Sequence, residues 1–274
     1  MEVFIFKDSQ QVAEYAADMI CNLLDFKSRA VLGLATGTTP IATYEVLINR
    51  FRAGQISFKR VTSFNLDEYI GLQSSSPHSY RSFMNKHLFD TIDIDPARTY
   101  LPECSPGQDP RSVGPDYEQR IVAAGGIDLQ LLGIGGNGHI GFNEPGSSLG
   151  SRTRVKVLTQ RTFEDNSRLF NEGDFQPHMA VTMGIATILD ARRILLLATG
   201  EHKAAAIKDT VEGAISAMHP ATVLQQHQRV RVILDEAAAS QLEHLDYYQW
   251  VQLQNDSIAA KHGGSADEDP WFHN

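Results

Sequence analysis

Short apolar runs alternate with longer amphipathic segments along most of this 274-residue chain. The runs "VLGLA" (31–35), "RILLLA" (193–198) and "VRVIL" (230–234) have the length of strands and few polar side chains. The segment "SQQVAEYAADMICNLLDF" (9–26) instead places apolar residues three and four positions apart, which is typical of a helix. Strands that alternate with helices predict an α/β fold with a Rossmann-like, mostly parallel sheet covered by helices on both faces.

The chain shows no internal repeat or low-complexity tract before residue 260, so residues 1–260 predict a single domain. Residues 101–116, "LPECSPGQDPRSVGPD", contain four prolines and are expected to form a long surface loop. The tail 261–274 is polar and glycine-rich and is expected to be disordered, with Trp271 and Phe272 as side chains able to dock. Strands are expected at 3–6, 31–35, 61–65, 128–134, 153–158, 193–198 and 230–234.

The formal net charge is −9, and no Lys/Arg-rich run offsets it. This balance argues against a nucleic-acid partner but leaves room for a small anionic ligand. The longest apolar runs are too short to cross a bilayer, and the opening "MEVFIFKDSQ" fits a first strand better than a signal peptide. Cys21 and Cys104 are the only cysteines, and free thiols are the simpler interpretation. A soluble cytoplasmic protein is expected.

Two predicted strands end in the same tripeptide, Ala-Thr-Gly, in "GLATGTTP" (33–40) and "LLATGEHK" (196–203). A helix is expected after each, with Thr39 as the N-cap and Pro40 at the first helical position in the first case. Free backbone N–H groups at a helix start suit a phosphate group, and Lys203 would add a positive charge. Ordinary strand–helix turns are the alternative, which the pair of loops together with the lysine makes less attractive.

The stretch "LLGIGGNGHIGFNEPG" (131–146) places Gly133, Gly135 and Gly138 in the spacing G-x-G-x-x-G. In a dinucleotide site the third glycine opens a helix, and an acidic residue follows about 20 residues later. Here Pro145 falls inside the segment that would have to be helical, where it would remove a hydrogen bond. The window "VKVLTQRT" supplies no carboxylate at the required distance. The context therefore argues against an NAD site.

The same stretch carries side chains suited to proton transfer. His139 is five residues before Glu144 and two after Asn137. Histidine exchanges protons near neutral pH, and a carboxylate or amide neighbour can fix its tautomer. A structural histidine bonded to the backbone is the alternative, but the glycine-rich end of a strand favours a catalytic site.

Two adjacent carboxylates, Asp67 and Glu68, follow the strand predicted at 61–65 in "VTSFNLDEYIGL". Adjacent residues on an extended chain point in opposite directions, so a pair that shares one proton is not expected. One carboxylate should face the site, while the other supports it or faces solvent. A solvated acidic turn is the alternative.

Several of these motifs resemble the glucosamine-6-phosphate deaminase family. The resemblance rests on "LGLATGTTP", "SFNLDEYIGL", "GIGGNGHIGFNEPGSSLGSRTRVKVLT", "NSRLF" and "ATGEHKAAAIKDTVEG", in the same order from about residue 1 to 250. It implies conversion of D-glucosamine 6-phosphate and water to D-fructose 6-phosphate and ammonium, in amino-sugar catabolism, without an organic or metal cofactor. The sequence has no cluster with zinc-ligand spacing, which agrees with that implication.

The resemblance also implies roles for individual residues. Asp67 resembles the general base that moves a proton from C2 to C1, and His139 resembles the acid/base that opens the sugar ring, held by Glu144. Asn137 stands where many members have aspartate and others asparagine, so the imidazole is expected to have a lower pKa than in an Asp form. The residues that resemble the family's phosphate ligands are Thr36, Gly37, Thr38, Thr39, Arg168 and Lys203.

Regulation is a second implication of the resemblance. Allosteric members bind N-acetylglucosamine 6-phosphate between the subunits of a hexamer, and their phosphate contacts resemble Ser147, Arg154 and Lys156. Tyr247 or Tyr248 is a candidate for a further contact. A homo-oligomer, with a hexamer as the candidate assembly, is expected on this basis. For Arg154 and Lys156, a solvated strand face is the alternative to an effector site.

Two other functions compete with this interpretation. A hydrolase of the 6-phosphogluconolactonase type would share the fold and the phosphate loop, but the "FNLDEY" segment favours the deaminase. A non-catalytic sugar-phosphate sensor would need a helix-turn-helix segment ahead of the domain, and the first strand is expected already at residue 3.

Overall fold

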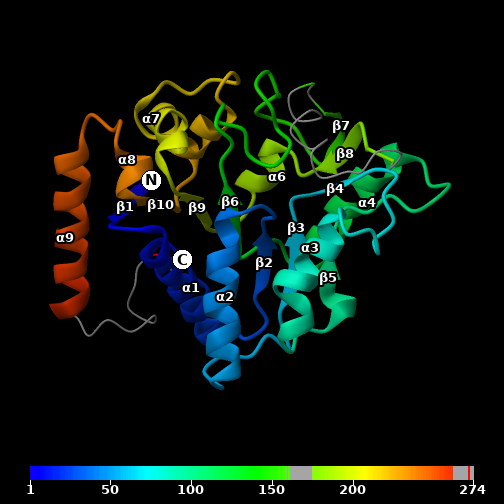
Figure 1. Cartoon of the computed structure of the whole chain (residues 1–274), viewed down its shortest axis with the longest axis horizontal. Coiled ribbons are helices and arrows are strands. Elements are labelled where there is room, and N and C mark those ends of the chain that lie inside the picture. Colours follow the sequence, from blue (N-terminus) through cyan, green and yellow to red (C-terminus); the bar gives the residue numbers. More distant parts are fainter. Residues whose placement is uncertain (159, 161–174, 262–270, 272–274) are drawn as a thin grey trace.

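A seven-stranded parallel sheet forms the centre of the molecule in the computed structural model, which describes residues 1–158, 160, 175–261 and 271 (Figure 1). Neighbouring strands all pair in parallel. The strand order is β1 (Glu2–Phe6), β10 (Val230–Asp235), β9 (Ile194–Ala198), β6 (Leu129–Gly133), β2 (Val31–Leu34), β3 (Thr62–Asn65) and β5 (Thr99–Tyr100). The α/β prediction is therefore confirmed.

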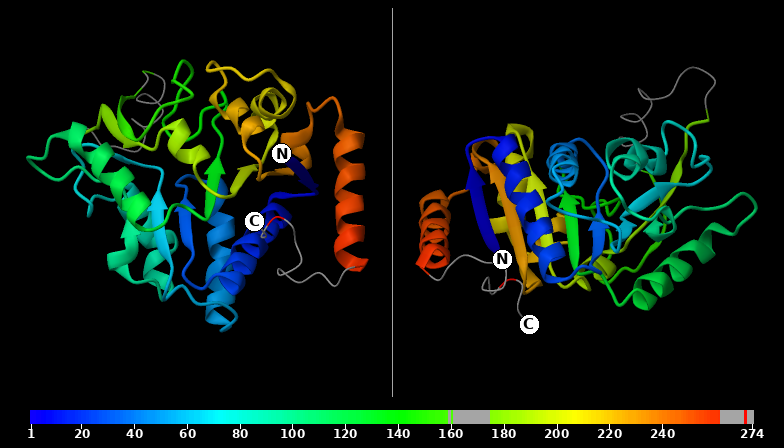
Figure 2. Two further views of the ribbon diagram at one scale, coloured as in Figure 1. Left: turned by 180° about the vertical axis from the view of Figure 1, so that it is seen from behind. Right: turned by 90° about the horizontal axis from the view of Figure 1, so that it is seen from below.

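Helices cover both faces of this sheet (Figure 2). One face packs against α1 (Ser9–Phe26), α2 (Thr39–Arg52) and α3 (Tyr80–His87). The other packs against α4 (Pro110–Ala123), α6 (Ile185–Leu189), α7 (Ala204–Glu212) and α8 (Glu236–Ala239). Strand β6 alternates between the two cores, because Leu129 and Leu131 lie in the first and Leu132 in the second. Helix α9 (Leu245–Lys261) lies outside the edge strand β1.

Short 3₁₀ segments complete the described elements. They are η1 (Phe89–Thr91), η2 (Pro96–Arg98), η3 (Glu201–Lys203) and η4 (Pro220–Gln226). None of the helices in the described ranges is both long and apolar enough to cross a membrane. Cys21 and Cys104 are free thiols, and Cys21 is buried.

A second, antiparallel sheet of three strands lies beside the main one. Its order is β4 (Asp67–Tyr69), β8 (Met179–Thr182) and β7 (Arg154–Val157). The strand predicted at 153–158 is thus β7, and it belongs to this small sheet. Its central partner β8 was not predicted, because four residues carry too little periodicity to indicate a strand.

The predicted loop at 101–116 is wrong in its second half, since α4 begins at Pro110. The Asp109 carboxylate accepts a hydrogen bond from the Arg111 backbone N–H and caps this helix. Proline is tolerated in the first turn of a helix, where its missing N–H has no intrahelical acceptor to lose. Pro110 therefore starts a helix within the segment that its prolines predicted as a loop.

Trp271 is buried at the amino end of the sheet, with 6% of its surface exposed. Its carbonyl accepts a hydrogen bond of 2.6 Å from Nε of Arg193, which directly precedes β9. The Arg231 guanidinium lies 4.7 Å from the centre of its ring and 5.2 Å from that of Phe4. Of the tail expected to be disordered, Lys261 instead ends α9, and residues 262–270 and 272–274, Phe272 included, lie outside the described residues.

Candidate active site

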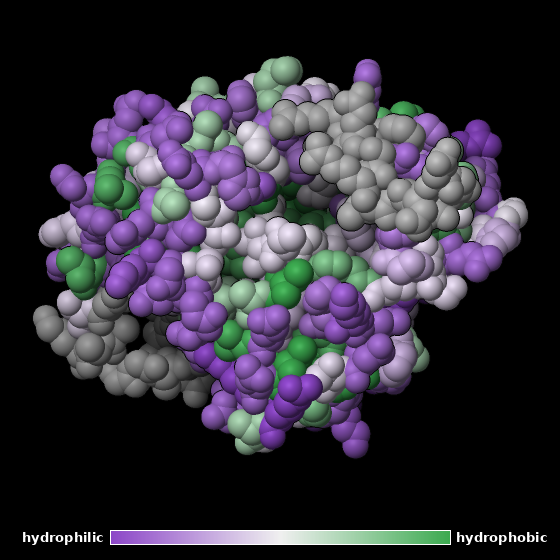
Figure 3. Space-filling view, viewed as in Figure 1, coloured by the Kyte–Doolittle hydropathy of each residue, from purple (hydrophilic) through white to green (hydrophobic). Residues whose placement is uncertain are grey.

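A cavity of about 210 Å³ opens where the strand order reverses, at the carboxyl ends of β2 and β6. Figure 3 shows the surface hollowed on this side of the molecule. Ligands of open α/β sheets collect at such switch points, since neighbouring loops diverge there. The predicted site residues that line the cavity are Thr36, Gly37, Thr38, Thr39, Asp67, His139 and Lys203.

The loop after β2 offers backbone donors to an anion. Helix α2 begins at Thr39, and Thr38 takes the N-cap position without a side-chain cap bond. The expected cap at Thr39 is therefore displaced by one residue. Gly37 has a φ of +115°, a conformation that favours glycine. Uncapped N–H groups at a helix start, flanked by threonine hydroxyls, suit a phosphate monoester.

The loop after β9 contributes less than the sequence suggests. The Gly200 N–H already donates to the Asp235 carboxylate at 2.9 Å, and Thr199 and Gly200 do not line the cavity. Lys203 does line it, and partial burial lowers the pKa of its ammonium group. No carboxylate in the described part of the chain forms an ion pair with Lys203. Arg168, the other predicted cation, lies outside the described residues.

The structure brings Asn137, His139 and Glu144 together beside the cavity. Nδ1 of His139 lies 2.7 Å from Oδ1 of Asn137 and 3.5 Å from Oε1 of Glu144. The Asn137 amide donates to Oε2 of Glu144 at 2.8 Å, which identifies its oxygen as the atom that faces the imidazole. Since both neighbours of Nδ1 are acceptors, the network assigns the proton of a neutral imidazole to Nδ1. Nε2 is then the basic nitrogen.

The position of the His139 imidazole depends on the absence of a side chain at Gly135. A Cβ on Gly135 would lie 2.1 Å from Cε1 of His139, so the imidazole packs directly over backbone. Behind the loop, the buried Asn143 donates to the carbonyls of Ile140 and Met183 and accepts from Nη1 of Arg154 at 2.9 Å. These bonds hold the part of the loop that directly precedes Glu144.

Asp67 is a buried carboxyl group at the start of β4, with 5% of its surface exposed. Burial raises its pKa to about 8, and the charge of Glu68 adds to the effect. A base whose pKa lies near the working pH transfers protons efficiently. A Cβ on Gly141 would lie 3.3 Å from Oδ2 of Asp67, which shows how closely the His139 loop approaches this carboxyl.

Glu68 points away from the cavity, as the alternation along a strand requires. Its carboxylate is buried and accepts hydrogen bonds from backbone N–H groups at the start of α3. Of the two adjacent carboxylates, one therefore faces the site and the other supports it, and neither forms a solvated turn.

Tyr80 is a cavity residue that the sequence did not reveal. Its hydroxyl lies 3.1 Å from that of Tyr69, and its ring stacks on Phe142 at 6.1 Å between centroids. The only local signal is Ser79, whose hydroxyl caps α3. A capping serine indicates where a helix starts, but the sequence does not say that its first residue faces a cavity.

The candidate effector residues lie on the small sheet and in the loop before it. Ser147 is buried, and its hydroxyl has no hydrogen-bond partner among the residues that are described. Arg154 and Lys156 project from the same side of β7. Tyr247 and Tyr248 are on α9, at the opposite side of the molecule from β7 (Figure 1), so one chain does not bring them together with the other three.

Fold and cavity together define an α/β protein in which Asp67 and His139 line one cavity with the helix-start loop at Thr36–Thr39. Over residues 1–158, 160, 175–261 and 271, no group of three or more His, Cys, Asp and Glu side chains is arranged to hold a metal ion. Residues 7–233 match the family model described as glucosamine-6-phosphate isomerases/6-phosphogluconolactonase. The chain belongs to this family.

Curated relatives match nearly the whole chain. A glucosamine-6-phosphate deaminase of Colwellia psychrerythraea is 56% identical over 96% of this chain and 98% of its own length. The protein of that name from Hahella chejuensis is 57% identical over 93% of this chain and 97% of its own length. A solved monomeric glucosamine-6-phosphate deaminase superposes with a TM-score of 0.83 at 44% identity, over 88% of this chain and 99% of its own. A 6-phosphogluconolactonase from Trypanosoma cruzi, at 18% identity and a TM-score of 0.70 over 88% of this chain and 97% of its own, shares the fold.

Proposed function

We propose that this chain is a glucosamine-6-phosphate deaminase, which converts D-glucosamine 6-phosphate and water to D-fructose 6-phosphate and ammonium in amino-sugar catabolism. The observation that carries the proposal is the placement of Asp67 and His139 in one cavity with the Thr36–Thr39 loop. Curated relatives of that name at more than half identity support the substrate.

The phosphate binds at the Thr36–Thr39 loop, with the Lys203 ammonium as a point charge. The sugar ring then extends toward the His139 loop. Nε2 of His139 takes the proton of the anomeric hydroxyl and delivers it to the ring oxygen, which opens the ring. Glu144 and Asn137 hold the imidazole in the tautomer whose Nε2 carries no proton and can accept one.

Asp67 takes the proton from C2 of the open-chain aldose, which gives an enolamine between C1 and C2. Return of a proton to C1 places the double bond between C2 and nitrogen. Water adds to this imine and ammonium leaves, so that the products are fructose 6-phosphate and ammonium. Each positioned proton-transfer group contributes roughly 10²–10⁴-fold to the rate.

The test is an assay of ammonium and fructose 6-phosphate after incubation with glucosamine 6-phosphate. Asp67→Asn should lose about 10³-fold in kcat, because an amide cannot take the C2 proton in place of the carboxylate. Asp116→Asn, an exposed residue of α4, is the matched control and should be unchanged. An Asp67→Asn variant with full turnover would reject the assigned mechanism. Turnover of 6-phosphogluconolactone instead would favour the lactonase. Turnover of neither substrate would favour the non-catalytic sensor.

We further propose that N-acetylglucosamine 6-phosphate activates the enzyme through Ser147, Arg154 and Lys156. The contact between Arg154 and Asn143 supports this, since Asn143 adjoins Glu144 in the catalytic loop. The effector should raise the apparent affinity for substrate, and Lys156→Met should abolish that effect without changing basal turnover. Saturating effector that alters neither sigmoidicity nor affinity would reject the proposal.

Assembly into a homo-oligomer, a hexamer in the allosteric members, is a separate part of the proposal. One relative of known structure is described as monomeric. Sedimentation velocity with and without the effector measures the state of this chain directly, and a monomer under both conditions would reject the oligomer.

A further inference from the structure

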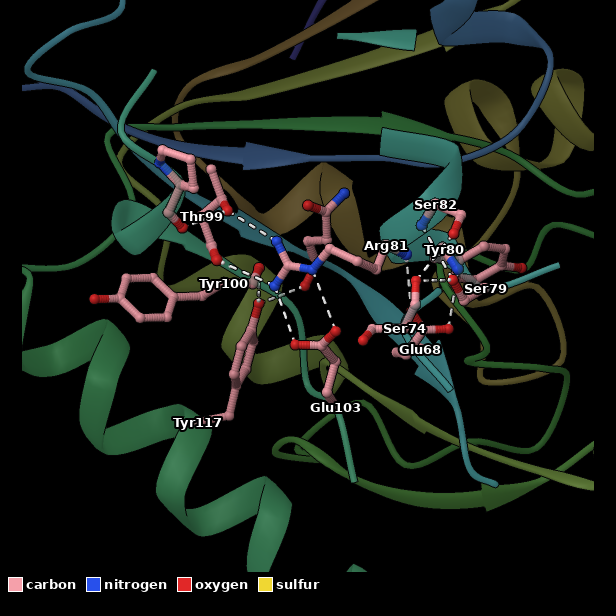
Figure 4. A network of polar contacts seen from close by, with 12 residues as sticks. Glu68, Ser74, Ser79, Tyr80, Arg81, Ser82, Thr99, Tyr100, Glu103 and Tyr117 are labelled. Atoms are coloured by element: carbon pink, nitrogen blue, oxygen red, sulfur yellow. Dashed lines mark hydrogen bonds and ion pairs between the residues drawn. The ribbon is translucent and has the colours of Figure 1, made fainter. Parts of the chain in front are cut away.

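Strand β4 carries Asp67 and Glu68 as neighbours, and their side chains face opposite ways. Asp67 lines the cavity, whereas the Glu68 side chain lies against the amino end of α3 (Figure 4). Only 3% of the Glu68 surface is exposed. A carboxylate this deeply buried is costly unless hydrogen bonds satisfy its oxygens.

Three backbone N–H groups satisfy them. Oε1 accepts from Tyr69 at 2.8 Å and from Tyr80 at 3.0 Å, and Oε2 accepts from Arg81 at 2.9 Å. The last two donors are the first residues of α3, whose N–H groups have no acceptor within the helix. A carboxylate there also interacts favourably with the positive end of the helix dipole. Glu68 thus joins β4 to α3 through charge-assisted hydrogen bonds.

The residue fixed by this cap is part of the cavity wall. The Tyr80 hydroxyl meets that of Tyr69, from the same strand as Asp67, and its ring stacks on Phe142 with an interplanar angle of 14°. Phe142 follows Gly141 in the loop that carries His139. Tyr80 therefore contacts both segments that supply the proton-transfer groups.

A second anchor fixes the same helix start from its other side. The Arg81 guanidinium donates to both carboxylate oxygens of Glu103, at 3.2 and 3.0 Å, and to Oγ1 of Thr99 at 2.8 Å. Thr99 begins β5 of the main sheet. Figure 4 shows Arg81 between these partners and Glu68. The amino end of α3 is thereby held between the two sheets.

We propose that Glu68 is a positioning residue for proton abstraction at C2: it caps α3, holds Tyr80 in the cavity wall and places its negative charge behind Asp67. The inference rests on the proposed function, since it needs Asp67 to act as the base. The charge of Glu68 contributes to the raised pKa of Asp67, second to burial. Positioning and charge are separable by substitution.

Glu68→Gln removes the charge and turns one acceptor into an NH₂ group that meets a backbone donor. The acid limb of the kcat/KM profile, set by Asp67, should move to lower pH by about 0.5 to 1 unit. Glu68→Asp keeps the charge but shortens the side chain, so kcat should fall about 10-fold while the limb stays in place. KM should change less than about threefold in both, because the phosphate loop lies on other elements.

The assays are repeated with substrate deuterated at C2. A primary isotope effect on kcat shows that the measured rate reports proton abstraction from C2. Glu103→Gln is the matched control: it weakens the other anchor of α3 without touching β4, so the limb should not move. Asp67→Asn is the reference for the proposed function, and its full activity would reject that function itself. If Asp67→Asn is inactive but the acid limb does not move in Glu68→Gln, the proposed role of the Glu68 charge is overturned.

The positioning role has its own test, which also serves if Glu68→Gln does not fold. Unchanged kcat in a folded Glu68→Asp variant would overturn positioning, and a fall in kcat at constant KM would support it. Thermal unfolding of every variant, in the same buffer as the assay, separates lost activity from lost folded protein.

Discussion

The side-chain oxygen of Asn137 lies 2.7 Å from Nδ1 of His139. Its nitrogen donates to Glu144, so one neutral amide orients the imidazole and the carboxylate at the same time. An aspartate would supply a charge at this position but no donor. Asn137 therefore sets both the charge and the geometry of the acid–base cluster.

Asn137→Asp should shift the titration of His139 to higher pH. The added negative charge stabilises the imidazolium, by about 1 pH unit for a contact of this length. NMR of labelled histidine measures the shift directly. If the titration of His139 does not move, the amide does not control the imidazole.

Asp67→Asn should stabilise the protein at alkaline pH. The pKa of this carboxyl is raised to about 8 in the folded chain, so the unfolded chain ionises first as the pH rises. The group's contribution is thus complete below about pH 4 and is lost as the pH rises to about 8. The variant should gain roughly 2–5 kcal/mol in free energy of unfolding at pH 9 and almost nothing at pH 4.

Denaturant unfolding of Asp67→Asn at the two pH values checks this, with Asp116→Asn as the control that changes neither. An equal gain at both pH values would mean that the charge of Asp67 is not what destabilises the fold.

Gly135→Ala should disable the histidine while the fold survives. The new Cβ would fall 2.1 Å from the imidazole, which must rotate out of place. A misplacement of about 1 Å can cost about 100-fold in kcat. Gly136→Ala is the control, since its Cβ would meet only the His202 carbonyl at 3.9 Å. Steady-state kinetics with circular dichroism distinguish a local from a global effect, and equal kcat values for the two variants would contradict the prediction.

Lys203→Met should raise KM more than it lowers kcat. The lost ion pair with the substrate phosphate is worth about 1.5–3 kcal/mol, or roughly 10- to 100-fold in affinity. Lys208→Met, at a half-buried lysine of the following helix α7 that pairs with Glu243, should leave KM unchanged. A KM unaffected in Lys203→Met would remove Lys203 from the phosphate site.

Trp271→Ala should destabilise the protein by about 3 kcal/mol, because it empties a buried aromatic site and removes the ring stacked on Arg231. Trp250→Ala on α9 is the control, because 59% of its surface is exposed. Differential scanning calorimetry should show a lower Tm for the first variant alone. Equal Tm values would show that the Trp271 contact adds no stability.

The central strands were predictable because strands of a parallel sheet, buried on both faces, are written as nearly continuous apolar runs. Strand β4 was not predictable, since two of its three residues are charged. It pairs with the distant strand β8, where Asp67 lies opposite Thr182. A pairing so distant in sequence leaves no local pattern. The small sheet is a product of tertiary contacts.

The site shows the same division. Asn137, His139 and Glu144 lie within one short loop, so their spacing made a contact possible, and the family resemblance assigned Glu144 to hold His139. Tyr80 has no such signal, because the partners that place it, Glu68 and Phe142, come from other segments. Sequence reasoning identified the candidate proton-transfer groups but not Tyr80, which packs beside them.

The Arg231 guanidinium lies between the rings of Phe4 and Trp271, and its Nε donates to Glu2 at 2.8 Å. Fraying of β1 and release of residue 271 therefore break the same contact, although the two segments are remote in sequence. Amide hydrogens of β1 should exchange with solvent in step with loosening around Trp271. Arg231 thereby joins two regions into a single cooperative unit. Without its side chain, the two regions would open independently.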